Sequence, residues 1–370
     1  MIAFWGYNGS MRIEEFDYSL PPELIAQTPV EPRDHARLLV IDRDTGGIEH
    51  RRFYELAEYL KPGDLLVANE SKVLPARLLG YKVDTGGKVE VLLLRPVPQP
   101  GEEGGEPATW EALVSPGRRV QEGTRLGFGS RGADGPHLEC TVVARGELGG
   151  RIVRFDRPPR PLLDALGQMP LPPYIHEKLS DPARYQTVYA RAEGSAAAPT
   201  AGLHFTQRLI EELKGKGVGF ATVVLHVGLD TFRPVHEENV EEHPMHSEWY
   251  SLPRETAEAI RRARAGGGRV VAVGTTSVRV LETEAEAQGI EAGDRGREVA
   301  AGEGWSRLYI RPGYRFGLVD AMITNFHLPR TTLLMLVSAF AGRELILRAY
   351  DEAIRERYRF YSFGDATFIK

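Results

Sequence analysis

Histidines gather in one stretch of this sequence, where their side chains suit either proton transfer or metal binding. Four of the ten histidines are His226, His236, His243 and His246. An imidazole changes its charge near neutral pH and can therefore act as a general acid or base. The HxxH spacing of the last two could instead bind a metal ion, but no HExxH motif or cysteine partner accompanies it. We expect no metal site, and spacing alone does not separate proton transfer from ordinary structural histidines.

Two further segments place hydrogen-bonding side chains in predicted loops. Segment 324–331 (TNFHLPRT) follows the apolar run 319–323 and precedes a predicted helix, which is where sites form in α/β proteins. Its Asn325 and His327 exceed what helix capping requires, so we favour a functional loop. The small residues of segment 196–205 (AAAPTAGLHF) let a flat ligand approach the backbone, although a packed turn around a buried imidazole would use the same residues.

Segment 269–279 (RVVAVGTTSVR) has the pattern of a buried strand, a tight turn and the start of a helix. The free amides and positive potential of a helix N-terminus can bind a carboxylate or a phosphate. A capped turn without any ligand would show the same hydroxyl residues. Both interpretations stay open on these residues alone.

The elements that must position these segments follow from hydrophobic periodicity. Beyond residue 158, helical and strand-like patterns alternate, which predicts an α/β domain with a largely parallel sheet and flanking helices. Sites in such domains gather on loops at the carboxyl ends of the strands. The predicted helices are 206–214, 254–265, 277–288, 331–340 and 343–355, and the predicted strands are 218–227, 269–273, 307–311 and 319–323.

Residues 72–157 have a different sequence pattern, in which glycine and proline separate short strand-like runs. This pattern is typical of a small antiparallel β-barrel or sandwich. We therefore expect an inserted β domain at 72–157, an α/β catalytic domain formed by 11–71 and 158–370, and an N-terminal extension at 1–10.

Bulk composition excludes several classes of protein. Apolar residues make up 42% of the 370-residue chain and charged residues 26%, as in ordinary globular proteins. No apolar run reaches the length of a membrane span, no signal peptide is evident, and the single cysteine, Cys140, fits a reducing compartment, so we expect a cytoplasmic protein. Neither GxGxxG after a strand nor a P-loop occurs, which disfavours nicotinamide and nucleoside-triphosphate enzymes.

The net charge of −5 argues against general coating of nucleic acid, so any RNA contact must be local. The candidate arginines are Arg261, Arg262, Arg264, Arg269, Arg355, Arg357 and Arg359, with Tyr358, Phe360 and Tyr361 as candidate stacking partners. Solvated arginines on amphipathic helices are the commoner explanation of such a pattern.

Taken together, these segments resemble one enzyme family, the S-adenosylmethionine:tRNA ribosyltransferase-isomerases. The resemblance extends over nearly the whole chain from Met11. Asp230 stands where the family has a glycine. The blocks that carry the resemblance are FDYSLPPELIAQTP (16–29), PGDLLVANESKVLPARL (62–78), MPLPPYI (169–175), YQTVY (185–189), AAPTAGLHF (197–205), LHVGLDTFRPV (225–235), MHSEWY (245–250), VGTTSVRVLE (273–282), VDAMITNFHLPRTTLLMLVSAFAG (319–342) and YRFYSFGDATFI (358–369).

The resemblance implies a step of queuosine biosynthesis. The ribosyl part of S-adenosylmethionine would move onto the aminomethyl group of 7-aminomethyl-7-deazaguanine at the tRNA wobble position, giving epoxyqueuosine and releasing adenine and methionine. S-adenosylmethionine would be a consumed cosubstrate, no metal would take part, and we favour a monomer.

Such a reaction needs proton transfers, for which imidazoles and burial-tuned carboxylates are suited. We expect Arg279 and the turn at 275–277 to hold the methionine carboxylate, and Asn325 to read a base edge. The expected acid/base groups are His204, His226, His246 and His327 with Glu248 and Asp320, and the expected cosubstrate-binding residues are Thr200, Thr275, Thr276, Ser277, Arg279 and Asn325. A noncatalytic tRNA-binding module and a metal-dependent hydrolase are the alternatives.

Overall fold

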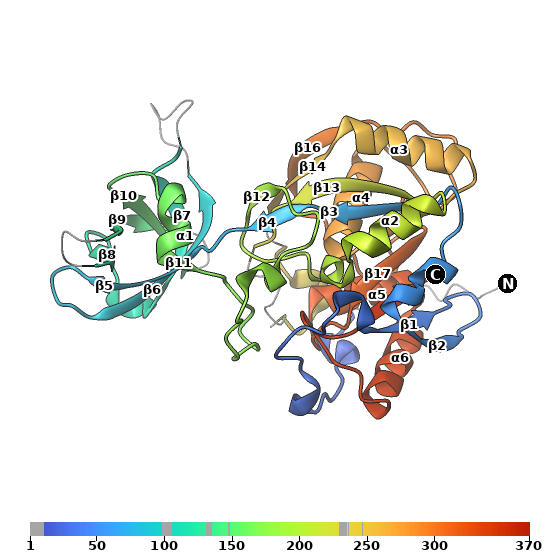
Figure 1. Cartoon of the computed structure of the whole chain (residues 1–370), viewed down its shortest axis with the longest axis horizontal. Helices are drawn as coiled ribbons and strands as arrows, with labels where there is room; N and C mark the ends of the chain where they lie inside the picture. Colours follow the sequence, from blue (N-terminus) through green and yellow to red (C-terminus); the bar gives the residue numbers. More distant parts are fainter. Residues whose placement is uncertain are drawn as a thin grey trace. The chain divides into compact units, whose positions relative to one another are not determined.

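The computed structural model describes residues 11–97, 106–130, 135–146, 149–228, 235, 237–245 and 247–370. The chain forms two compact units (Figure 1). The first comprises the chain up to Ser71 with Pro172–Ala192 and Ala198–Lys370, and the second comprises Lys72–Leu171 with Glu193–Ala197. The second unit thus extends past the expected domain limit at residue 157.

A sheet of nine described strands forms the centre of the first unit. In spatial order the strands are β16 (Gly302–Ser306), β14 (Glu248–Leu252), β13 (Gly219–Leu225), β3 (Leu65–Asn69), β15 (Val270–Val273), β17 (Ala321–Asn325), β18 (Ala366–Ile369), β1 (Arg37–Ile41) and β2 (Ile48–Arg52). The apolar residues of β3, β15 and β17 are buried on both faces, as expected for central strands.

The prediction of a largely parallel sheet was wrong, because this sheet is mixed. Only β13, β3, β15 and β17 form a continuous parallel core, to which the parallel pair β18 and β1 is added. The pairs β14–β16, β13–β14, β17–β18 and β1–β2 are antiparallel. The short turn after β1 forces a hairpin, and the two successive helices after β17 return the chain so that β18 runs against β17.

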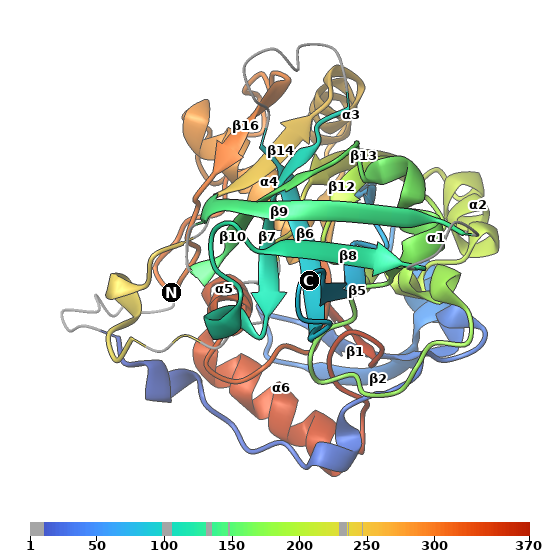
Figure 2. The same ribbon diagram turned by 90° about the vertical axis from the view of Figure 1, so that its left-hand side faces the viewer.

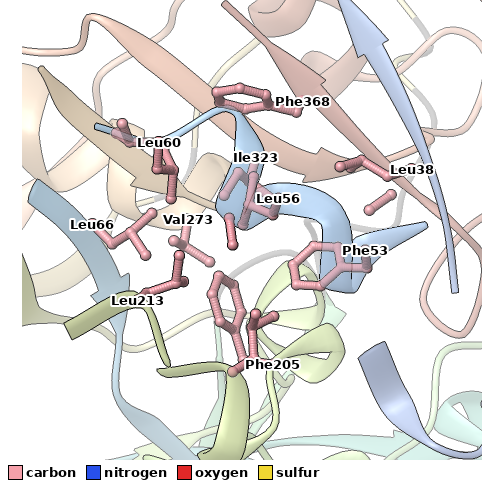
Figure 3. Close-up of a cluster of buried hydrophobic side chains, with 14 of the residues drawn as sticks. Leu38, Phe53, Leu56, Leu60, Leu66, Phe205, Leu213, Val273, Ile323 and Phe368 are labelled. Atoms are coloured by element: carbon pink, nitrogen blue, oxygen red, sulfur yellow. The ribbon is translucent and has the colours of Figure 1, made fainter. Parts of the chain in front are cut away.

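Helices cover both faces of the sheet. On one face, α2 (Gln207–Gly215) and the 3₁₀ turn η4 (Phe53–Glu58) pack on Leu66, Val273 and Ile323, as Figure 3 shows. Successive strand residues point to opposite faces, so Leu65 and Val67 face α3 (Arg254–Ala265) and α4 (Thr275–Ala287), which pack on the same strands. The remaining helices are α5 (Thr332–Ala341) and α6 (Arg343–Arg355), with 3₁₀ turns η1 (Ile13–Phe16), η2 (Pro22–Leu24), η3 (Arg33–His35), η8 (Pro182–Tyr185), η9 (Thr200–His204) and η11 (Val240–Glu242).

No helix in the described part of the chain is long and apolar enough to cross a membrane.

The second unit is a closed antiparallel barrel, which confirms the expected inserted β-barrel. Its strands follow each other in the order β5–β6–β7–β10–β9–β8, and β8 pairs back with β5 (Figure 2). A Cβ on Gly80 would lie 2.4 Å from the carbonyl oxygen of Gly127, so the closing seam requires glycine. The strands are β5 (Arg77–Lys82), β6 (Lys88–Pro96), β7 (Thr109–Ser115), β8 (Arg125–Gly129), β9 (His137–Arg145) and β10 (Arg151–Phe155), joined by β11 (Gly167–Gln168), α1 (Leu163–Leu166), η5 (Gly117–Arg119) and η7 (Arg160–Leu162), while β4 (Ser71–Val73) pairs with β12 (Ala192–Ser195).

Candidate active site

Two adjoining pockets open at the carboxyl ends of the central parallel strands of the first unit. We name them after their most polar residues, the Asn325 pocket and the Arg279 pocket. Counted together with the solvent at their mouths, they hold about 540 Å³ and about 610 Å³ of open space, respectively. Thr275, Thr276 and Leu333 line both of them. This is the position at which α/β sheets build binding sites.

The Asn325 pocket brings together segments that are far apart in the sequence. Its wall comes from the loop after β17, the turn after β15, the η9 segment and the C-terminal block. The lining residues are Tyr174, Ala198, Pro199, Thr200, Ala201, Val227, Gly274, Thr275, Thr276, Thr324, Asn325, Phe326, His327, Leu328, Leu333, Tyr361 and Ser362. The predicted site residues Thr200, Thr275, Thr276, Asn325 and His327 therefore meet at one cavity.

Asn325 is held by three hydrogen bonds. Its Nδ2 donates to the Tyr361 carbonyl oxygen (3.1 Å) and to Nε2 of His204 (3.2 Å). Its Oδ1 accepts from the Thr200 hydroxyl (3.1 Å). Both amide hydrogens are thus used within the protein, which leaves only a lone pair of Oδ1 for a ligand. This geometry suits a residue that fixes the pocket wall better than one that reads a base edge.

His204 stands behind Asn325 and does not contact the Asn325 pocket itself. Because its Nε2 accepts from Asn325, its ring proton resides on Nδ1. Burial, with smaller contributions from the positive charges of Arg359 and Arg33, lowers the pKa of His204 to about 3. The imidazole is therefore neutral at physiological pH, and its position indicates that it orients Asn325.

His327 is the imidazole that faces the Asn325 pocket. Its Nε2 lies 2.9 Å from the hydroxyl of Thr324, and its backbone N–H donates to the Tyr350 hydroxyl (3.0 Å). Burial lowers the pKa of His327 to about 3, so the ring is neutral and can accept a proton. Its backbone is held on both sides, since the Tyr18 hydroxyl donates to its carbonyl oxygen.

The turn after β15 begins α4 in a backbone conformation that favours glycine, with Gly274 at φ 87°. The first amides of α4 lack intrahelical acceptors, and the first two residues of the helix, Thr275 and Thr276, line both pockets. The Thr276 hydroxyl is buried without a hydrogen-bond partner among the described residues. Ser277 differs, because its hydroxyl donates to the Val273 carbonyl oxygen (2.8 Å) and it lines neither pocket.

The Arg279 pocket has a buried ion pair set in an apolar wall. The Arg279 guanidinium donates to Glu248, whose other carboxylate oxygen accepts from the backbone N–H of Gly228 (2.9 Å). Arg279 and Glu248 are only 7% and 6% exposed, so the two charges lie in a region of low dielectric. Most of the remaining wall is apolar, and its residues are Leu225, His243, Met245, Leu308, Tyr309, Ile310, Thr332, Leu333 and Leu336 with Thr275 and Thr276.

Two predicted acid/base residues, Asp320 and His226, do not line either pocket. Asp320 precedes β17 and therefore lies at its amino end, about 16 Å along the strand from Asn325. There it accepts from the backbone N–H of Val270 (2.8 Å) and from Arg295 (2.9 Å). His226 lines neither pocket, and its ring stacks on Trp249 with 5.2 Å between centroids. His246, like His236 and Asp230, lies outside the described residues.

Some residues of the Asn325 pocket were missed by the sequence reasoning. Tyr174 and Ser362 join across the pocket wall, with 2.6 Å between their hydroxyl oxygens. Tyr361, placed only among candidate stacking surfaces, lines the pocket with its backbone at φ 70°. All three residues lie in the blocks 169–175 and 358–369, and the resemblance of these blocks to the family was the sequence signal that could have identified them.

Other aromatic and arginine residues that were candidates for RNA contact lie inside the protein. Tyr358 and Phe360 are fully buried and cannot stack on an RNA base from outside. Arg264 is buried as well and donates to the carbonyl oxygens of Gly317 and Asp294. Among the residues with a described placement, no group of three or more His, Cys, Asp or Glu side chains is arranged to hold a metal ion.

Comparison with known proteins identifies the family. The sequence model of the family described as queuosine biosynthesis protein matches residues 13–369. Two similar relatives, both named S-adenosylmethionine:tRNA ribosyltransferase-isomerase, come from Moorella thermoacetica (59% identity) and Symbiobacterium thermophilum (56% identity). Each alignment covers 97% of this chain and 100% of the relative.

A solved structure extends the comparison. The crystal structure of S-adenosylmethionine tRNA ribosyltransferase from Thermotoga maritima has 43% sequence identity to this chain and a TM-score of 0.53. The alignment covers 96% of this chain and 100% of that one. The resemblance seen in the sequence blocks is thereby confirmed, and the chain belongs to the S-adenosylmethionine:tRNA ribosyltransferase-isomerase family of queuosine biosynthesis enzymes.

Proposed function

We propose that this enzyme transfers and isomerises the ribosyl part of S-adenosylmethionine onto the aminomethyl group of 7-aminomethyl-7-deazaguanine at the wobble position of tRNA. The products would be epoxyqueuosine in tRNA, free adenine and methionine. One observation carries the proposal: two pockets of about 540 and 610 Å³ adjoin at a shared wall of Thr275, Thr276 and Leu333. That arrangement offers one space for the methionine end of the cosubstrate and another, across the shared wall, where its ribose can meet a base extruded from the tRNA.

The reaction begins with removal of a proton from the ribose carbon beside the sulfonium, whose positive charge stabilises the resulting carbanion. Adenine then leaves as the sugar opens. The neutral amine of the tRNA base adds to the opened sugar, and an alkoxide closes the epoxide as methionine departs. The sulfonium charge supplies the activation, so the proposed reaction requires no metal ion.

We assign the proton acceptor to His327. Its imidazole faces the Asn325 pocket in the neutral form, which a general base must have. For this role its Nε2–H donates to the Thr324 hydroxyl oxygen, 2.9 Å away, which limits the orientations of the ring and leaves the lone pair of Nδ1 to take the proton. The pKa of about 3 makes it a weak base, so proton transfer depends on the acidity that the sulfonium gives to the adjacent carbon.

The Arg279 pocket suits the methionine end of the cosubstrate. A zwitterionic amino acid carries a carboxylate and an ammonium group, and the Arg279–Glu248 pair offers one complementary charge to each. The first-turn amides of α4 add donors for the carboxylate. In this arrangement Thr275 and Thr276 lie between the methionine end and the reacting ribose.

The test is an incubation of the purified enzyme with S-adenosylmethionine and tRNA that carries 7-aminomethyl-7-deazaguanine. We expect stoichiometric release of adenine and methionine, together with a tRNA nucleoside whose mass has increased by the transferred sugar. Binding of tRNA without adenine release would instead identify a noncatalytic binding module. Loss of turnover after metal removal, restored by adding the metal, would favour the metal-dependent alternative. We further propose that the enzyme acts in the cytoplasm as a monomer.

A further inference from the structure

A third cavity of the first unit has a positive lining that the proposed reaction does not use. It encloses about 270 Å³ of open space, and its wall includes Arg33, Arg184, His204 and Ser362. We call it the arginine pocket. Ser362 also lines the Asn325 pocket, and His204 bonds to Asn325, so the two cavities are separated by a thin wall.

The guanidinium groups at this pocket are held in place by backbone carbonyls. Arg33 donates to the carbonyl oxygens of Gln186 (2.6 Å) and Ala183 (3.0 Å), and Arg184 donates to that of Val30 (2.8 Å). These acceptors are neutral, so they fix the geometry of the cations without balancing their charge. An anion that enters the pocket would meet preorganised donors at little entropic cost.

The positive charge at the pocket is only partly compensated by direct ion pairs. Within the described residues, neither Arg33 nor the neighbouring Arg359 forms an ion pair, and only Arg184 has one, with Glu31 at 2.7 Å. Glu31 is 72% exposed, so this pair is weak. Burial lowers the pKa of Arg33, and the adjacent Arg184 lowers it further, whereas Glu31 and Asp181 act in the opposite direction. The two guanidinium groups at the pocket therefore repel each other, and an anion between them would relieve that repulsion.

We propose that the arginine pocket binds a backbone phosphate of the substrate tRNA. Guanidinium forks match phosphate oxygens in bidentate geometry, which favours this anion over a small halide. The chain as a whole is acidic, with a net charge of −5, so a local concentration of arginine is where RNA contact gains most. The inference rests on the proposed function, and it places a phosphate beside the wall of the Asn325 pocket.

The experiment measures the affinity of the full-length enzyme for tRNA as a function of salt. Arg33→Gln should weaken binding and reduce the slope of log Kd against log salt by about 0.7 to 0.9, the value for one lost phosphate contact. Because Arg33 also holds two carbonyls, a second variant is needed. Glu31→Gln should tighten tRNA binding by about two- to fivefold, since it releases Arg184 from its exposed partner. Misfolding cannot produce tighter binding.

The α3 surface offers matched controls. Glu258 pairs with Arg254 at 3.0 Å, and the Arg254 side chain is 86% exposed, so Glu258→Gln makes the same charge change as Glu31→Gln and also releases an arginine. Arg254→Gln matches Arg33→Gln in charge. Both controls should leave tRNA affinity and its salt slope close to those of the wild type. If Glu258→Gln tightens binding as much as Glu31→Gln does, the effect is one of net charge and the proposal is overturned.

A second arm separates an RNA phosphate from a free one. The thermal midpoint of the wild type and of Arg33→Gln is measured with inorganic phosphate or chloride at equal ionic strength. If phosphate stabilises the wild type but not Arg33→Gln, and all variants show equal tRNA salt slopes, the pocket binds free phosphate and not tRNA. Unchanged tRNA binding in Arg33→Gln and Glu31→Gln would likewise overturn the proposal. Adenine release by the wild type tests the proposed function separately.

Discussion

The two ends of the central parallel strands carry similar polar side chains in opposite circumstances. At the amino ends, Asp64 before β3 accepts from Arg269, and Asp320 before β17 accepts from Arg295 and a backbone N–H. At the carboxyl ends, Asn325 and His327 face open pocket space. Charged groups close one end of the sheet, whereas mostly neutral groups line a cavity at the other. Strand direction, more than residue type, indicates which polar residues can reach a substrate.

Removing a charged partner at the amino ends of the strands should lower stability most. Asp64 is 2% exposed, and its carboxylate accepts from the Arg269 guanidinium (2.6 Å) and from the backbone N–H groups of Arg269 and Lys61 (2.9 Å each). Asp64→Ala leaves the Arg269 charge and two backbone donors without their partner. We expect the free energy of unfolding to fall by about 3 kcal/mol, measured by urea denaturation.

The same variant also tests the contrast between the two ends. Turnover per folded molecule should remain near the wild-type value, since Asp64 lies at the far end of β3 from the pockets. An Asp64→Ala enzyme that is fully stable but inactive would show that the amino end takes part in catalysis.

At the carboxyl ends of the strands, the largest effect of a substitution should be on turnover. His327→Ala removes the proposed proton acceptor, and we expect kcat for adenine release to fall by at least about 10²-fold, which corresponds to roughly 2.7 kcal/mol. Thermal unfolding and binding of S-adenosylmethionine report whether the pocket is intact. Near-normal turnover by a folded His327→Ala enzyme would remove this residue from the role.

Acid should lower the stability of the protein through the buried imidazole of His204. The pKa of His204 is lowered to about 3 in the native state. Between pH 3 and 6.5 this imidazole therefore binds a proton in the unfolded chain but stays neutral in the native state. Stability therefore falls as the pH drops below 6.5 and is unaffected by this group above it. From pH 7 to pH 5 this group should cost about 2 kcal/mol.

His204→Gln checks this expectation, because it keeps an acceptor for Asn325 but does not titrate. Its unfolding free energy should decline less over the same pH range, by about 2 kcal/mol. Parallel pH profiles of the variant and the wild type would show that His204 is not protected from protonation.

Much of the fold could be predicted because hydrophobic periodicity and the positions of glycine and proline are local features of the sequence. The predicted helices 254–265 and 343–355 coincide with α3 and α6, and the glycine-punctuated runs correspond to the barrel strands. The mixed character of the sheet was not predictable in the same way. It depends on β14 and β18, short strands whose pairing partners lie far away in the sequence. Register and direction of such strands are decided by tertiary packing and not by local pattern.

The candidate site shows the same limit. Asn325 and His327 were found because a polar loop followed an apolar run. The bonding of Asn325 to Thr200, His204 and Tyr361 joins three distant segments, so its occupied amide could not be inferred from any one of them. Asp320 was nominated for its residue type, although its place at the start of the predicted strand 319–323 already implied the amino end of the sheet and not the end where sites form.

The smallest expected effect concerns Asp320 and gives the sharpest test of that reasoning. Its carboxylate accepts one backbone hydrogen bond and forms a half-exposed pair with Arg295, with side chains 29% and 43% exposed. Solvent screens that pair, so most of its value is the bond to Val270. Asp320→Ala should lower the free energy of unfolding by about 1 kcal/mol.

Catalysis should be unaffected by the same change. If strand direction governs function here, kcat of Asp320→Ala must stay within about twofold of the wild type, whereas a general base lost from the reaction would lower it by 10²-fold or more. Asp320→Asn keeps an oxygen for the Val270 N–H and provides the control for stability. A large loss of kcat in both variants, with the fold intact, would mean that a group at the amino end communicates with the pockets through β17 itself.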